Sequence, residues 1–93
     1  MAFFLKFIVM ELNEKFLKAA ERVHALDTRP SNENLLKMYG LYKQATEGDV
    51  IGNRPGGFDF KGIAKYDSWA SLKGTPKEIA MQQYIDLVNS LFE

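Results

Sequence analysis

The sequence contains no cysteine and only one histidine, His24. Without cysteine the chain has no disulfide frame, no thiol nucleophile and no thiolate metal site. A single imidazole also excludes a zinc site built on several histidines, so we expect no metal site. Twelve Lys and Arg residues balance twelve Asp and Glu residues. This balance argues against a nucleic-acid-binding module, which normally carries a basic excess. A cytoplasmic location fits a chain without cysteine.

The chain also lacks a long hydrophobic run. Its most apolar stretch, residues 1–10 (MAFFLKFIVM), has one charged residue, Lys6. A membrane-spanning helix needs about 20 apolar residues, and the basic start and cleavage site of a signal peptide are missing. Three interpretations stay open: an added turn or strand packed on the domain or on a second copy, a segment at a membrane surface, and a start upstream of the natural one, since Met10 is itself a plausible initiator. The first is favoured. We treat residues 1–12 as an N-terminal extension and residues 13–93 as the domain.

Ninety-three residues make one small domain with a single core. Apolar residues recur in steps of three and four over residues 12–26, which predicts an amphipathic helix with Asn13 as its N-cap. A second predicted helix begins near Ser31 and continues to Ala45, before Gly48 ends it as a left-handed C-cap.

Two further helices are predicted beyond a long loop at residues 46–57, which carries four of the seven glycines. The third spans about residues 61–73. The fourth has the clearest start, because Thr75 can act as its N-cap, Pro76 can take the first helical position and Glu78 follows. Alternation typical of strands is absent. The sequence therefore predicts an all-α domain of four helices.

Aromatic and basic side chains cluster on the second predicted helix. Tyr39, Tyr42 and Lys43 fall at i, i+3 and i+4, so they share one face. They are either residues at the edge of the core, with their polar ends in water, or a flat aromatic platform for a ring with a cation beside it for a phosphate. Lys61 and Lys65, also at i and i+4, give a second basic edge. Arg29 gives a third positive group.

The segment at residues 30–48, PSNENLLKMYGLYKQATEG, resembles the signature of the acyl-CoA-binding proteins. Shorter matches follow in the same order as in that family: residues 54–56, 59–62, 64–65, 69, 72–75, 80–81 and 84–85. The similarity covers roughly residues 13–92 without a detectable gap.

This resemblance implies an antiparallel four-helix bundle with up-down-down-up topology and a long loop between helices 2 and 3. It also implies a monomeric protein that binds medium- to long-chain fatty acyl-CoA thioesters. Such a protein is an intracellular carrier and pool-former in lipid metabolism, without catalysis and without a cofactor. Long-chain acyl-CoA is the expected partner, with transient contacts to a membrane or to acyl-CoA enzymes, no transmembrane segment and no nucleic acid. The alternative is a helical protein- or membrane-interaction module recruited through its apolar N-terminus.

The resemblance also implies roles for individual residues. Tyr39 and Tyr42 would contact the coenzyme, Lys43 would pair with its 3′-phosphate, Lys65 would hold the nucleotide end and Tyr84 would close the site. The supporting residues are Arg29 for phosphate charge, His24 and Lys61 at the phosphate edge, and Ala20, Leu36 and Met38 along the acyl path. Two positions depart from the family pattern: His24 stands where many members carry lysine, and Tyr66 replaces a common tryptophan. Trp69 is expected in the core with its indole N–H near the ligand.

Overall fold

The computed structural model describes the backbone of residues 2–93 and the side chains of residues 4–93. Over these residues the chain forms α1 (Ala2–Arg22), a 3-10 turn η1 (Val23–Ala25), α2 (Asn32–Glu47), α3 (Phe60–Ala70) and α4 (Lys77–Leu91). No strand occurs in the described part. The prediction of an all-α domain with four helices is confirmed.

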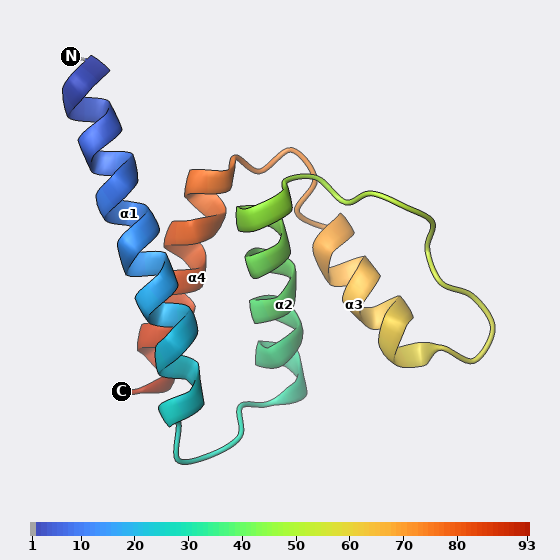
Figure 1. Cartoon of the computed structure of the whole chain (residues 1–93). Helices are drawn as coiled ribbons and strands as arrows, with labels where there is room; N and C mark the ends of the chain where they lie inside the picture. The colour runs from blue at the N-terminus through green and yellow to red at the C-terminus, as the bar shows by residue number, and fades with distance from the viewer. Residues whose placement is uncertain (1) are drawn as a thin grey trace.

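The helices form an antiparallel bundle in which α1 and α4 run in one direction and α2 and α3 in the other (Figure 1). The connection at residues 48–59 carries the chain from the end of α2 back along the molecule to the start of α3. Helix α4 packs against both α1 and α2, and α3 packs against α2. This is the up-down-down-up topology that the family resemblance implies.

The hydrophobic core lies between α1, α2 and α4. Its buried members are Phe16, Ala19, Met38, Leu41, Ala45, Ala80, Tyr84, Ile85 and Val88. They fall at helical spacings of three and four, because one stripe of each helix faces the interior. Helix α3 stands beside this core and contributes one buried side chain, Trp69. The α2–α3 contact is therefore a separate layer, and it is the layer that borders the candidate site.

The start of α1 differs from the sequence-based prediction. Residues 2–12 form neither a turn nor a strand, because α1 is continuous from Ala2 to Arg22, and Asn13 lies inside it rather than at its N-cap. Residues 2–12 contain no proline or glycine to break a helix. Once packing fixes the helical turn around Phe16, the helix is already nucleated. Each further turn toward the N-terminus then forms at a low cost in free energy. No helix in the described part of the chain is both long and apolar enough to cross a membrane.

The ends of α2 agree with the sequence pattern. Ser31 is the N-cap, and its Oγ accepts a hydrogen bond from the backbone N–H of Asn34 at 3.1 Å. At the other end Gly48 has φ +83°, and its N–H donates to the carbonyl of Gln44 at 3.1 Å. Its ψ of −149° places it outside the left-handed helical region that we expected, but the positive φ still explains why glycine ends the helix.

The ends of α3 and α4 were predicted less well. Helix α3 begins at Phe60, because Asp59 Oδ1 accepts the N–H of Gly62 at 3.0 Å and so caps it. It ends at Ala70, three residues before the predicted Lys73, and a turn follows. For α4, the N-cap is Pro76 and not Thr75, since the Pro76 carbonyl accepts the first helical bond, from Ala80 at 3.0 Å.

Candidate functional site

A cavity of about 570 Å³ lies between the first halves of α2 and α3. The lining residues are Arg29, Asn32, Leu35, Leu36, Tyr39, Lys61, Ala64 and Lys65. Five of them were candidate site residues in the sequence: Arg29, Leu36, Tyr39, Lys61 and Lys65. The structure therefore brings three cations, one phenol ring and an apolar wall to one place, although they come from separate parts of the chain.

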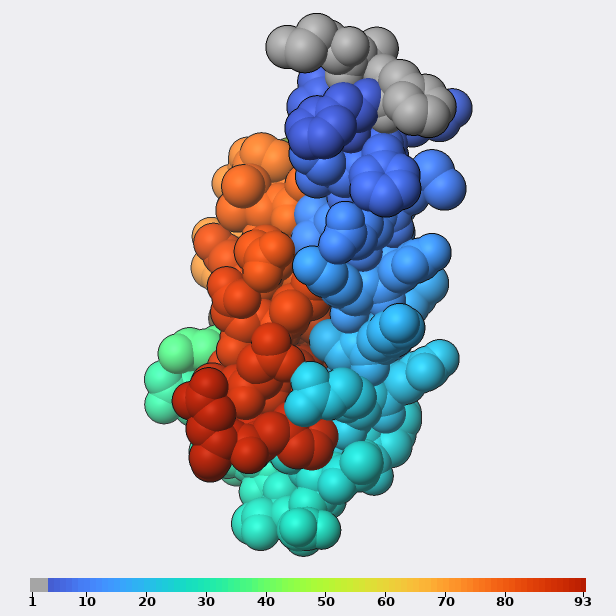
Figure 2. Space-filling view, turned by 90° about the vertical axis from the view of Figure 1, so that its left-hand side faces the viewer, coloured from blue at the N-terminus to red at the C-terminus, as the bar shows by residue number. Residues whose placement is uncertain are grey.

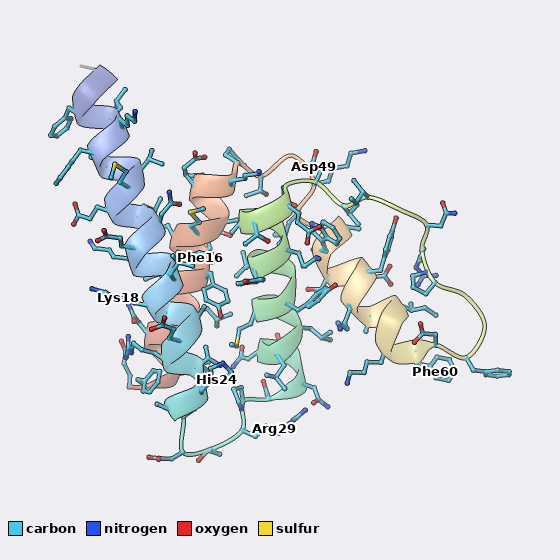
Figure 3. The ribbon with its side chains drawn as sticks, viewed as in Figure 1. Phe16, Lys18, His24, Arg29, Asp49 and Phe60 are labelled. Atoms are coloured by element: carbon cyan, nitrogen blue, oxygen red, sulfur yellow. The ribbon has the colours of Figure 1, made fainter. Side chains whose placement is uncertain are left out.

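Arg29 reaches this cavity from the connection that precedes α2 (Figure 3). Its Nη1 donates to Asn32 Oδ1 at 3.0 Å and to the carbonyl of Pro30 at 3.4 Å. Both acceptors are neutral, so the guanidinium keeps its positive charge uncompensated by these contacts. Because a guanidinium carries five N–H donors, it can hold these bonds and still bind an anion.

Tyr39 and Lys65 face each other across the cavity. The Lys65 ammonium lies 4.7 Å from the centre of the Tyr39 ring, a cation–π distance. Lys61 lies one turn before Lys65 on α3 and is exposed. The two lysines thus form one positive edge on α3, opposite the ring that α2 supplies.

Lys43 is placed differently, because it does not line this cavity. Its ammonium is paired with the carboxylate of Glu47 one turn later on α2 and lies 4.8 Å from the centre of the Trp69 ring. The hydrogen bond to Glu47 raises the pKa of Lys43 above its usual value. Lys43 therefore stays charged, but a phosphate would have to compete with Glu47 for it.

Tyr42 and Tyr84 belong to a third group of side chains. The Tyr42 ring stacks on Phe16 with centroids 5.5 Å apart, and Tyr84 meets Phe16 edge-on at 5.1 Å. Figure 3 shows Phe16 pointing from α1 toward α2 and α4. Burial raises the pKa of the Tyr84 hydroxyl, and the nearby Tyr42 adds to that effect. Tyr39 and Tyr42 face different neighbours, so they do not form the single flat platform that their spacing suggested.

The remaining candidates lie away from the cavity lining. Met38 is 7% exposed and belongs to the core. Ala20 is half-buried and packs against the same core. His24 is exposed in η1, at the end of α1 (Figure 3). These three residues stay predictions for the acyl path and the phosphate edge.

Three contacts hold the long loop against α3, next to the cavity. Arg54 forms a bidentate ion pair with Asp67, with N–O distances of 2.8 and 2.9 Å. The Tyr66 hydroxyl donates to the Gly52 carbonyl at 3.1 Å. The Trp69 indole N–H donates to the Gly48 carbonyl at 2.7 Å. Trp69 is buried as expected, and its indole N–H is occupied by the loop. That this N–H lies near the ligand stays a prediction.

Three lining residues, Asn32, Leu35 and Ala64, were not singled out for the site from the sequence. Asn32 and Leu35 lie one turn apart on α2, and Leu35 precedes Tyr39 by four positions. Asn32, Leu35 and Tyr39 therefore share one face of α2. Ala64 sits directly before Lys65. The helical face that carries Tyr39 could have indicated Asn32 and Leu35, and the face that carries Lys61 and Lys65 could have indicated Ala64. The described residues hold no group of three or more His, Asp or Glu placed to bind a metal ion.

Comparisons with known proteins show which family the chain is similar to. A family described as "Acyl CoA binding protein" matches residues 13–88. The acyl-CoA-binding protein of Gossypium hirsutum is 48% identical over 84 residues, which cover 90% of this chain and 94% of that protein. Enoyl-CoA delta isomerase 2 of Rattus norvegicus is 49% identical over 78 residues, but these cover 84% of this chain and only 20% of the rat protein.

Solved structures show the same fold. The crystal structure of acyl-CoA-binding protein 2 from Oryza sativa superposes with a TM-score of 0.89 at 44% identity, covering 92% of this chain and 94% of that one. The fungal structure from Moniliophthora perniciosa gives 0.80 at 43% identity, covering 85% of this chain and 78% of that one. With a family match over most of its length and relatives near 48% identity, the chain belongs to the acyl-CoA-binding protein family.

Proposed function

We propose that the protein binds medium- to long-chain fatty acyl-CoA thioesters at the α2–α3 cavity and carries them in the cytoplasm as a monomer, without turning them over. The observation that carries this proposal is the convergence of Arg29, Lys61 and Lys65 around the Tyr39 ring in one cavity. An acyl-CoA offers matching groups: several phosphates, an adenine ring and a hydrocarbon chain. The family membership supports the same ligand class.

The basic residues suit the phosphates of the coenzyme. Lys65 contacts only the face of Tyr39 in the described structure, an interaction worth about 0.5–1 kcal/mol at exposed sites. A hydrogen bond to a charged group contributes about 1.5–3 kcal/mol. We therefore expect Lys65 to exchange the ring for a phosphate when ligand binds. The vacated ring face then stacks on adenine.

The apolar wall of the cavity suits the hydrocarbon end of the ligand. Leu35, Leu36 and Ala64 line it, and Leu36, with Ala20 and Met38, is the proposed acyl path. Burying a methylene contributes about 0.8 kcal/mol. Two added carbons should thus tighten binding by about tenfold until the wall is covered.

A carrier without catalysis fits the relatives that are named for binding alone. The rat isomerase does not weigh against this, because the present chain matches one-fifth of its length. We propose no cofactor. The neutral balance of charges makes the local cations, and not the overall field, the source of attraction for the ligand.

Calorimetric titration with palmitoyl-CoA, octanoyl-CoA and free palmitate tests the proposal. We expect one-to-one binding of palmitoyl-CoA, weaker binding of octanoyl-CoA and little binding of palmitate, since palmitate lacks the phosphates and adenine. Binding of palmitate as tight as that of palmitoyl-CoA would show that the cations and Tyr39 do not recognise the head. A free-thiol assay on the same mixtures would detect thioester hydrolysis, and release of coenzyme A would contradict the carrier role.

A further inference from the structure

The N-terminal turns of α1 extend past the ends of α2 and α4 (Figure 1), and the space-filling view shows them standing clear of the α4 surface (Figure 2). Among the side chains described at residues 4–10, all are apolar except Lys6. Their exposed fractions are Phe4 63%, Leu5 62%, Phe7 58%, Ile8 42%, Val9 37% and Met10 57%. The first buried side chain described on α1 is Phe16, so none of the side chains at residues 4–10 is buried.

These apolar side chains surround the helix rather than form a stripe. Successive residues of an α-helix are rotated by about 100°. The six apolar positions between 4 and 10 therefore point around the whole circumference, and Lys6 is the single polar interruption. A second copy of the chain, or another folded protein, would cover one face and leave the rest in water. A lipid phase can surround a helix on every side, and a helix that is apolar all round is suited to such a medium.

We propose that residues 4–10 insert into one leaflet of a lipid bilayer and hold the protein at the membrane surface. At about 1.5 Å per residue the segment is about 10 Å long, one-third of a hydrocarbon core of about 30 Å. It can enter a leaflet but not cross it. The long side chain of Lys6 can reach back to the lipid phosphates. Glu11 and Lys15, paired at 3.3 Å, begin the charged part of α1 and mark the limit of insertion.

The attachment is driven by apolar contact and not by charge. Lys6 is the only charged residue among residues 4–10. Anionic lipid should therefore strengthen the binding only slightly, and salt should weaken it only slightly, because salt screens only charge–charge attraction. Neutral vesicles should therefore bind the protein, and the binding should persist in concentrated salt. Attachment through Arg29, Lys61 and Lys65 at the cavity would behave oppositely, since those cations would require anionic lipid and low salt.

Flotation of the full-length protein with extruded dioleoyl-phosphatidylcholine vesicles, without acyl-CoA, tests the proposal. We expect the protein to float with the vesicles at low and at high salt. The double substitution F4D/F7D should reduce the partition coefficient by about tenfold or more, because it replaces two large apolar side chains by charges. Leu17→Asp is the matched control: Leu17 is 59% exposed on the same helix but beside the bundle, so this variant should float like the original. Circular dichroism verifies that both variants keep their helices.

A second readout locates the inserted residues. Phe7→Trp and Leu17→Trp each add one indole to the buried Trp69, which gives a constant background. With vesicles, only Phe7→Trp should shift to shorter wavelength and be quenched by brominated lipid. The proposal is overturned if the full chain does not float, if F4D/F7D floats equally well, or if binding requires anionic lipid and low salt. It is also overturned if sedimentation shows a dimer that F4D/F7D abolishes and vesicles leave intact, because a second copy would then cover the segment.

Discussion

Tyr39 connects the α2 and α3 sides of the cavity, since its ring lines the cavity from α2 and contacts the ammonium of Lys65 on α3. If adenine stacks on this ring, the aromatic face matters and the hydroxyl does not. Stacking of a base on an aromatic side chain contributes about 1–3 kcal/mol, so Tyr39→Ala should weaken palmitoyl-CoA binding by about tenfold to a hundredfold. Tyr39→Phe should stay within about threefold of the original, because it keeps the ring. Equal losses in calorimetric titration would argue against stacking.

Glu47 and a ligand phosphate should compete for the ammonium of Lys43, and this competition can be measured. Its ammonium is paired with Glu47, so a phosphate that binds Lys43 must displace that carboxylate. Exposed helix pairs contribute about 0.3–0.5 kcal/mol, less than a charge-assisted bond to phosphate. We therefore expect Lys43→Ala to weaken palmitoyl-CoA binding by about tenfold and Glu47→Gln to strengthen it by about twofold.

The double variant K43A/E47Q is the control for this competition. If Glu47 acts only by occupying Lys43, the gain from Glu47→Gln disappears once Lys43 is absent. A gain that persists in the double variant would instead indicate a general effect of negative charge near the ligand. Unchanged affinity in Lys43→Ala would remove Lys43 from the site.

Asp49 has a structural role that depends on pH. Its Oδ1 accepts the backbone N–H of Gly74 at 2.8 Å and the amide of Gln44 at 2.9 Å, joining the end of α2 to the turn before α4. These bonds, that of Gly74 first, lower the pKa of Asp49 below its ordinary value. A lowered folded-state pKa stabilises the fold above the unfolded pKa, and the stabilisation is lost as pH falls through the folded value.

Two substitutions at Asp49 separate its charge from its hydrogen bonds. Asp49→Asn keeps an acceptor oxygen, so it should lower the Tm near pH 7, and the difference from the original should close as the pH falls through the lowered pKa of Asp49. Asp49→Ala removes the acceptor and should lower the Tm at every pH. Thermal unfolding followed by circular dichroism across this range measures both. A deficit in Asp49→Asn that stays constant with pH would contradict the role of the charge.

At the scale of the elements, the α2–α3 contact depends on Gly40. A Cβ at this position would lie 2.7 Å from both the carbonyl oxygen and the Oγ of Ser68. The Ser68 hydroxyl also donates to the Leu36 carbonyl at 2.5 Å, so the two helices approach closely here. The absence of a side chain at Gly40 therefore permits the close approach of α2 and α3.

Gly40→Ala should be destabilising although alanine is the better helix former. The gain in helix propensity is about 1 kcal/mol, whereas overpacking against a backbone carbonyl costs about 1–3 kcal/mol. We expect a Tm lower by a few degrees together with weaker palmitoyl-CoA binding, because α3 must move away from α2. Gly56→Ala is the control, since its added methyl meets nothing within 4 Å. A stabilised Gly40→Ala with full affinity would show that the helices separate without cost to the site.

For the whole molecule, the apolar periodicity predicted the number and order of the helices, because α1, α2 and α4 each bury one stripe and α3 buries Trp69. It could not place the ends of α3 and α4, since these depend on local bonds. Asp59 caps α3 with one oxygen, and the carbonyl of Pro76 takes the first bond of α4. Nor could helical spacing separate Tyr39 from Tyr42. The neighbours that divide them, Lys65 on one side and Phe16 on the other, are brought there by tertiary packing.

The N-terminal turns of α1 and the ligand site are separate parts of the molecule, and removing residues 1–9 tests that separation. The apolar side chains described at residues 4–9 are between 37% and 63% exposed, so their loss removes little packing. The shortened helix would begin near Glu11 and Glu14, which interact favourably with a helix N-terminus. We expect a Tm within a few degrees of the original and an unchanged affinity for palmitoyl-CoA, with loss of vesicle flotation. If affinity falls as well, the segment contributes to the ligand site. If flotation survives, the membrane contact lies elsewhere, and the acyl-CoA site is unaffected by that outcome.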